Sequence, residues 1–279
     1  MSDHPVAALC RVLGISRSTA YRREAVRGPR YRRADDELVL GQIRVVLRSR
    51  ATYGHRRVTA RVNRCFGTRY NRKRIRRVMQ MNGLCLPVVN RRRGRAHRGR
   101  IIRDRVNERW CSDALVIGCW NAEVVHVAFA LDCHDREVVA HVAAARPFVA
   151  EDIQELMRRA VWHRFGSRRP SEAIQWLSDN GSIYTALSTE WEAERLHLEP
   201  ITTPAYSPQS NGMSEAFVNT LKRDYVDGAD CSSAETVLRQ VPGWIEDYNE
   251  SAPHSGLGQR SPRQYRREQT RKEAQILDQ

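Results

Sequence analysis

The sequence lacks the cysteine patterns of a zinc site or of a disulfide-stapled domain. Its seven cysteines are scattered, with no C-x-x-C pair and no Cys/His pairing at zinc-ligand spacing. A chain of 279 residues can bury a full hydrophobic core without such cross-links. We therefore expect reduced, mainly structural cysteines in a cytosolic protein.

Long hydrophobic runs are missing as well. The longest apolar stretch, residues 124–131, is interrupted by His126 and is too short to cross a bilayer. The N-terminus has no apolar segment like that of a signal peptide. These absences predict a soluble protein with no membrane partner.

Acidic residues are scarce in the N-terminal part of the chain. Residues 1–109 contain 30 Lys and Arg against 7 Asp and Glu, a net charge of +23, whereas residues 110–279 contain 17 against 25, a net charge of −8. An Arg-rich module of this kind is typical of nucleic-acid binding, because neutralising phosphates releases counterions. A protein that is merely soluble with a high pI would not explain so uneven a distribution.

The first basic segment, residues 1–33, fits a helix-turn-helix. Residues 5–23 divide into two short helices at Gly14, and the second would begin with Arg17, Ser18 and Thr19. These three residues are candidate DNA contacts, because the second helix of such a motif enters the major groove. An ordinary αα-hairpin would give the same pattern.

Residues 34–89 fit a trihelical DNA-binding domain. Three amphipathic helices are predicted at about 35–49, 56–64 and 72–82, and the last is capped by Asn71. A solvated basic helix is the alternative, but two such modules in one basic region favour DNA binding. Candidate contacts on the last helix are Arg72, Lys73, Arg76 and Arg77.

Residues 90–106 form a basic linker without apolar periodicity. Arg91, Arg92 and Arg93 lie in it and are further candidates for phosphate contact. The linker separates the basic region from a core at 107–270, which is followed by a C-terminal tail at 271–279.

The core has the pattern of a mixed-sheet α/β domain. Three strands at about 110–117, 124–131 and 137–143 precede a helix at 150–165, a strand at 173–177, a helix at 186–196, a strand at 198–202 and two more helices. Trp176, Trp191 and Trp244 are expected in its interior. Asp132 and Asp135 lie at a hairpin turn and are expected to be structural, and His254 is expected to be buried or capping.

Three acidic residues of this core can converge on one point. Asp113 lies in the first strand, Asp179 ends a later strand, and Glu215 shares a helix face with Asn219 and Lys222. Carboxylates brought together would repel, so they call for a cation, and hard oxygen ligands select Mg²⁺ or Mn²⁺. Two ions roughly 3.5–4 Å apart support phosphodiester chemistry, with Lys222 near a phosphate. A solvated helix face would look the same if it were taken alone.

The motifs around these acids resemble those of a known family. They are Trp110-Cys111-Ser112-Asp113, residues 178–184 (SDNGSIY), residues 207–215 (SPQSNGMSE) and residues 221–225 (LKRDY), with 35 residues between Asp179 and Glu215. The chain resembles the DDE transposases and integrases with a ribonuclease-H-like core. Within them it is most similar to the second-frame product of IS-three family insertion sequences, in the IS-two-like branch. The sequence departs from the usual family motifs at Ala114, Leu115, Leu177 and Ile183. These differences bear on the subgroup and on local packing, because none of these positions supplies a metal ligand.

The resemblance implies a DNA transposase. Asp113, Asp179 and Glu215 would bind two Mg²⁺ ions, with Mn²⁺ able to substitute, and would support cleavage at the ends of an insertion sequence followed by strand transfer. The implied partners are the terminal inverted repeats, target DNA, further copies of the chain, and a first-frame OrfA protein or a frameshift fusion to it. The implied location is the bacterial cytoplasm, in association with the nucleoid.

Two other functions remain open from the sequence. A DNA-binding regulator with a decayed, non-catalytic core would keep the basic region, but it would be expected to have lost at least one of the three acids. A ribonuclease-H-type nuclease would share the metal chemistry but would not need the long basic region.

Overall fold

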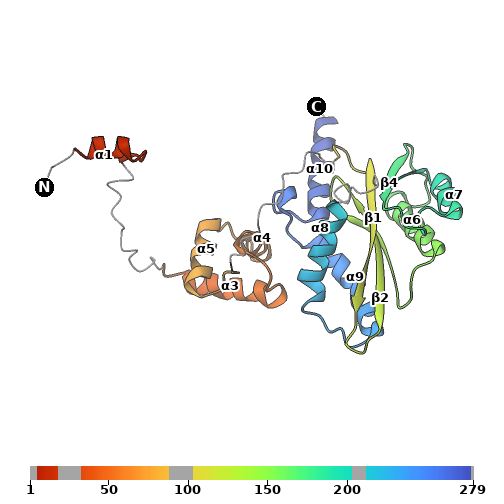
Figure 1. The fold of residues 1–279 in the computed structure, drawn as a ribbon, viewed down its shortest axis with the longest axis horizontal. Helices are drawn as coiled ribbons and strands as arrows, with labels where there is room; N and C mark the ends of the chain where they lie inside the picture. The colour runs from red at the N-terminus through yellow and green to blue at the C-terminus, as the bar shows by residue number, and fades with distance from the viewer. Residues whose placement is uncertain (1–4, 18–32, 88–102, 203–211, 278–279) are drawn as a thin grey trace.

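A computed structural model describes residues 5–17, 33–87, 103–202 and 212–277. In Figure 1 the described part forms a helical region on the N-terminal side and an α/β region on the C-terminal side. None of the helices in these ranges combines the length and the apolarity that a bilayer crossing needs.

Short amphipathic helices make up the N-terminal region. Helix α1 spans Val6–Val12, and α3 (Asp36–Ser49), α4 (His55–Cys65) and α5 (Arg72–Met81) form a trihelical domain. Its core contains Ile43, Val62 and Ile75, all fully buried. Asn71 caps α5 by accepting a hydrogen bond from the Lys73 backbone N–H at 2.8 Å. The three helices predicted from apolar spacing are confirmed.

A five-stranded mixed sheet forms the centre of the α/β region. The strands are β1 (Arg109–Gly118), β2 (Val124–Asp132), β3 (Val138–Ala144), β4 (Ile174–Ser178) and β5 (Leu198–Thr202). Their spatial order is β3-β2-β1-β4-β5. The first three pair antiparallel, whereas β4 is parallel to both β1 and β5. The predicted mixed sheet is therefore confirmed.

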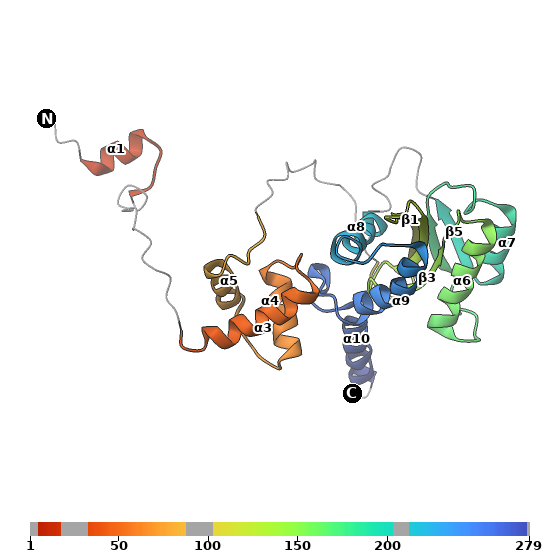
Figure 2. The ribbon, with the colours of Figure 1, turned by 90° about the horizontal axis from the view of Figure 1, so that it is seen from below.

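Helices cover both faces of the sheet. Helices α6 (Ala150–Phe165) and α7 (Leu187–Arg195) lie on one side, and α8 (Gly212–Leu221) and α9 (Ala234–Glu250) lie on the other (Figure 2). On the α8 side, Phe217 stacks between Phe129 and Tyr248, at ring-centroid distances of 4.4 and 4.8 Å. This apolar contact anchors α8 to the sheet and so fixes which side of the helix faces outward.

Three features differ from the sequence predictions or go beyond them. Trp176 is buried and Trp244 packs against the core as expected, but Trp191 is 69% exposed on α7, so its assignment to the interior was wrong. Helix α10 (Pro262–Leu277) is continuous across residue 270, where the sequence placed the end of the core. Between α8 and α9 the chain also forms a π-helical turn, η2 (Lys222–Val226).

Candidate catalytic site and nucleic-acid interface

The register of β1 and β4 places two acids at equivalent positions. Cys111 pairs with Leu177 in the parallel ladder, and Asp113 and Asp179 each lie two residues farther along. Side chains two residues apart in a strand share a face. Cys111 and Leu177 pack in the core that contains Phe217 and Leu221, so Asp113 in β1 points to the side of the sheet that α8 covers.

Helix α8 presents the third acid. Its Phe217 and Leu221 are buried against the sheet, while Glu215 and Asn219 are exposed. Lys222, at the start of the π-turn, is exposed as well. The division of this helix into an apolar and a polar side is therefore confirmed.

Electrostatic coupling links the three carboxylates. The pKa of Asp113 is raised above its usual value, first by burial and then by the negative charges of Asp179 and Glu215. A hydrogen bond from the Ala114 N–H at 2.8 Å opposes this rise. None of the three acids forms an ion pair with another described residue. The negative charges of Asp179 and Glu215 therefore act on Asp113.

The donor set suits a hard divalent cation, since it consists of carboxylate oxygens without thiolate or imidazole. Among the described residues, however, no three His, Cys, Asp or Glu side chains form a ready-made metal cluster. Asp179 is exposed and accepts a hydrogen bond from the Gly181 N–H at 3.1 Å. The residues fit Mg²⁺ in the chemistry of their side chains.

A basic surface spans α4 and α5. Arg72, Lys73 and Arg76 are exposed there, as predicted for DNA contacts. The pKa of His55 is lowered, first by its burial and then by the positive charges of Arg76, Arg72 and Arg56. Sequence reasoning missed His55 and Arg56, although their place at the start of a basic helix was a usable signal. We call the surface of His55, Arg56, Arg72 and Arg76 the α4–α5 basic surface.

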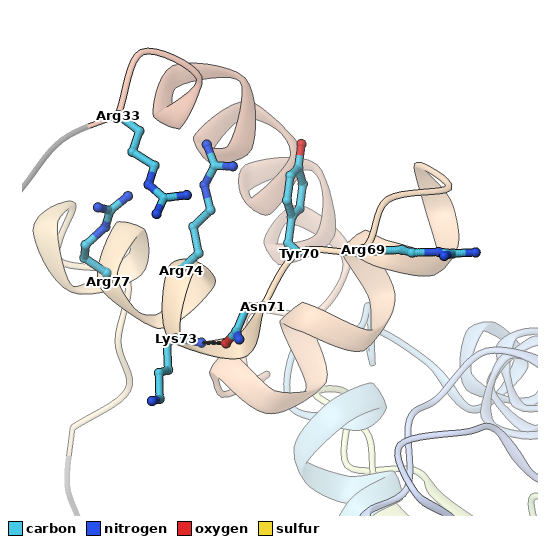
Figure 3. Close-up of a pocket in the computed structure, with 7 residues that line it drawn as sticks. All are labelled: Arg33, Arg69, Tyr70, Asn71, Lys73, Arg74 and Arg77. Carbon is cyan, nitrogen blue, oxygen red and sulfur yellow. Dashed lines mark hydrogen bonds between the residues drawn. The ribbon is translucent and has the colours of Figure 1, made fainter.

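Arg77 has a structural contact instead of a free surface position. Its guanidinium pairs with Asp36 at 2.5 Å, and Arg74 pairs with the same carboxylate at 3.3 Å. In Figure 3 the side chains of Arg33, Arg74 and Arg77 point toward one another, while Lys73 points away. The three arginines line a cavity of about 460 Å³, and its other lining residues are Arg69, Tyr70, Asn71 and Lys73.

The other predicted DNA contacts lie at or beyond the limits of the described residues. Arg17 is exposed, at the last described position before residue 33. Ser18, Thr19, Arg91, Arg92 and Arg93 fall outside the described ranges.

The acids at the β2–β3 turn are structural, as expected. Arg164 is fully buried and pairs with Asp135 at 3.0 Å and with Glu137 at 3.1 Å. Asp132 accepts hydrogen bonds from the Asn107 N–H at 2.8 Å and the Trp110 indole at 3.2 Å. These charges are matched within the fold, in contrast to those of Asp113, Asp179 and Glu215.

Comparisons with known proteins show which families the chain resembles. Two family descriptions, both "Integrase core domain", match residues 103–208 and 196–262, and "HTH-like domain" matches residues 33–93. The transposase InsD of insertion element IS2 from Escherichia coli is 42% identical over 248 residues, covering 86% of this chain and 82% of InsD. An uncharacterized protein of insertion element IS136 from Agrobacterium fabrum is 51% identical over 175 residues, covering 62% of this chain and 90% of the relative. The catalytic core of BIV integrase has a TM-score of 0.41 and 21% identity, covering 60% of this chain and 98% of that core.

A mixed sheet with helices on both faces, preceded by an HTH-like domain, defines an integrase-type protein with a ribonuclease-H-like core. Within that class, the chain belongs to the family of insertion-element transposases that includes InsD of IS2. The fold class and the family predicted from the sequence are confirmed.

Proposed function

We propose that the chain cleaves DNA at the ends of an insertion sequence and joins them to a target, with Asp113, Asp179 and Glu215 as the ligands of two Mg²⁺ ions. The observation that carries the proposal is the β1–β4 register, which places Asp113 and Asp179 at equivalent positions, with Glu215 on the helix that packs against this side of the sheet. The raised pKa of Asp113, caused first by burial and then by the charges of the two other carboxylates, supports it.

Two ions held by Asp113, Asp179 and Glu215 would supply activation of the attacking oxygen and stabilisation of the leaving 3′-oxygen. The chain's own residues hold and orient these reactants. Asp113 and Asp179 are supported by the sheet, and Glu215 by a helix anchored through Phe217. Lys222, exposed at the start of the π-turn directly after α8, contacts a DNA phosphate near the carboxylates. Mn²⁺ has the same preference for oxygen ligands and substitutes for Mg²⁺.

The α4–α5 basic surface binds the terminal inverted repeats, which places the ends of the element near the core. Several copies of the chain act together in the DNA complex, with an OrfA protein or a fusion to it as a further partner. The bacterial cytoplasm, at the nucleoid, is the corresponding location. A non-catalytic regulator is the second candidate. It is less favoured because all three acids are present: Asp113 and Asp179 lie at equivalent positions after paired strand residues, and Glu215 is exposed on α8.

Glu215→Gln tests the proposal, because it removes one metal ligand and no DNA contact. We expect the variant to lose Mg²⁺-dependent joining of end DNA and to retain end binding in a gel-shift assay. Glu235→Gln, at an exposed position of α9, is the matched control and retains both. Undiminished joining by Glu215→Gln would refute the catalytic assignment. Deleting residues 1–109 is expected to abolish specific end binding.

A further inference from the structure

The trihelical domain contacts the chain directly after the helix that carries Glu215. The Thr52 hydroxyl donates to Asp224 at 2.5 Å, and the Arg57 guanidinium donates to the other oxygen of Asp224 at 2.7 Å. Asp224 lies in the π-turn η2, which continues α8. Figures 1 and 2 show α4 on the side of the core where α8 and α9 lie.

A second contact reinforces the first. Arg50 pairs with Asp247 of α9 at 2.5 Å, and its guanidinium lies 4.2 Å from the centre of the Tyr225 ring. The Tyr225 hydroxyl donates to Asp247 at 3.0 Å. Both contacts therefore converge on η2 and on the part of α9 beside it. Farther along, Arg61 and Arg64 donate to the Ser251 carbonyl at 3.2 and 3.0 Å.

The Asp224 carboxylate is an unusual anchor, because its side chain is only 1% exposed. A buried carboxylate is costly unless charged and polar partners surround it. Asp224 has three such partners: Arg223 on its own turn, and Thr52 and Arg57 on the trihelical domain. Two of the three come from the other domain, so separating the domains would remove two of the groups that pair with this carboxylate.

Neighbouring arginines on α4 have different roles. Arg56 is exposed and belongs to the α4–α5 basic surface, whereas the next residue, Arg57, points to Asp224. A continuous path of protein contacts thus leads from the basic surface through Arg57 and Asp224 to α8 and Glu215. A buried pair at this point fixes the direction in which the basic surface faces relative to the carboxylates.

We infer that Asp224 is a positioning residue that, through Arg57 and Thr52, holds the DNA-binding domain in a fixed orientation against the helix of Glu215. The inference rests on the proposed function, since the purpose of this orientation is to present a bound DNA end to the three acids. Asp224 touches neither DNA nor metal in this role.

Variants of the full chain at both sides of the contact test the inference. Arg57→Glu places a carboxylate opposite Asp224, and Asp224→Asn removes the buried charge without altering the DNA-binding domain. We expect both to increase the radius of gyration in small-angle X-ray scattering and to slow joining on the order of tenfold, within the range of coupling between sites. The dissociation constant for end DNA should change little, because Arg56, Arg72 and Arg76 remain. Arg57→Lys, which keeps the charge, should recover both properties in large part, and Arg239→Glu on α9 is the control for a changed exposed charge.

Each outcome decides a part of the inference. An unchanged radius of gyration in both Arg57→Glu and Asp224→Asn overturns the fixed orientation. An increased radius with an undiminished joining rate overturns the positioning role. Equal losses in Arg57→Lys and Arg57→Glu would also contradict it, because charge pairing would then not matter. If the unaltered chain joins no DNA, the proposed function fails, while the scattering data still decide whether the domains are held together.

Discussion

The hydroxyl groups of Ser112 and Tyr184 lie 3.0 Å apart, within hydrogen-bond distance, between the two segments that carry Asp113 and Asp179. Ser112 directly precedes Asp113 on β1, and Tyr184 follows Asp179 in the segment after β4. Both side chains are buried, and burial raises the pKa of Tyr184. The bond therefore ties together the supports of two candidate metal ligands, beyond the point where the β1–β4 ladder ends.

Tyr184→Phe tests whether this bond positions the carboxylates. The variant keeps the ring and removes the hydroxyl, so we expect a stability loss of about 1 kcal/mol and a clearly slower joining reaction. Ser112→Ala should have a similar effect on joining, and the double variant should lose less than the sum of the two. Tyr265→Phe on α10 is the control. Additive losses in the double variant would show that the two hydroxyls act separately.

Metal binding can be measured apart from catalysis. A ligand that binds only the folded state raises the melting temperature as its concentration increases. We expect Mg²⁺ to raise the melting temperature of the chain, and Asp113→Asn to remove most of this shift by removing a ligand. The shift should also weaken as the pH falls, because protons compete for Asp113, whose pKa is raised. Glu151→Gln, in the first turn of α6, serves as the control. An equal Mg²⁺ shift in Asp113→Asn would contradict the assignment.

The basic residues of α5 are expected to fall into two groups. Arg72→Ala and Arg76→Ala should each weaken DNA binding for all sequences and reduce the slope of log K against log salt by about 1. Arg77→Ala should instead lower the free energy of unfolding, because it leaves Asp36 with fewer partners. Salt titrations and urea unfolding distinguish the two effects. Arg44→Ala, on the exposed side of α3, is the control for lost charge alone. If Arg77→Ala reduced the slope of log K against log salt by about 1 and left stability unchanged, the division of the α5 residues into two groups would be contradicted.

Local patterns predicted the parts of the site that depend on one element. The spacing of Phe217 and Leu221 identified the buried side of α8, and so the outward position of Glu215, because helical periodicity alone decides it. The turn after the fourth strand likewise located Asp179. The closeness of Asp179 to Asp113 depends on the β1–β4 register, which joins residues 66 positions apart in the sequence. That pairing could be inferred only from the resemblance to a family.

Contacts between distant segments could not be predicted in the same way. Arg77 looked like its exposed neighbours on α5, and only its pairing with Asp36, 41 residues earlier, shows that it is structural. Asp224 lies among other charged residues in the segment 221–225, and nothing local shows that it is buried and bonded to Thr52 and Arg57 of another domain. Trp191 is another such case, because its residue type alone does not show that its side of α7 is exposed among the described residues.

A histidine near the end of the core should make stability depend on pH. His254 stacks edge-on against Tyr248 at 4.7 Å, and burial, with the nearby charges of Arg136 and Arg57, lowers its pKa to about 3. In the unfolded chain its pKa is about 6.5. Between these values the unfolded state binds more protons than the folded state, so stability is lost as the pH falls from about 6.5 toward 3.

His254→Phe isolates this contribution, because it retains an aromatic ring against Tyr248 and removes the titrating group. We expect the free energy of unfolding of the variant to fall less steeply than that of the unaltered chain between pH 6.5 and pH 4.5. The difference in slope should not exceed about 1.4 kcal/mol per pH unit, the limit for one proton. Urea unfolding at several pH values provides the measurement. The comparison stops at pH 4.5 because Glu137 also takes up a proton below that pH. Its pKa is lowered in the folded chain although burial opposes this, so its protonation causes a further loss of stability. Identical slopes of unfolding free energy against pH for the two proteins would mean that His254 takes up a proton as readily in the folded chain as in the unfolded chain. That result would contradict the lowered pKa of His254.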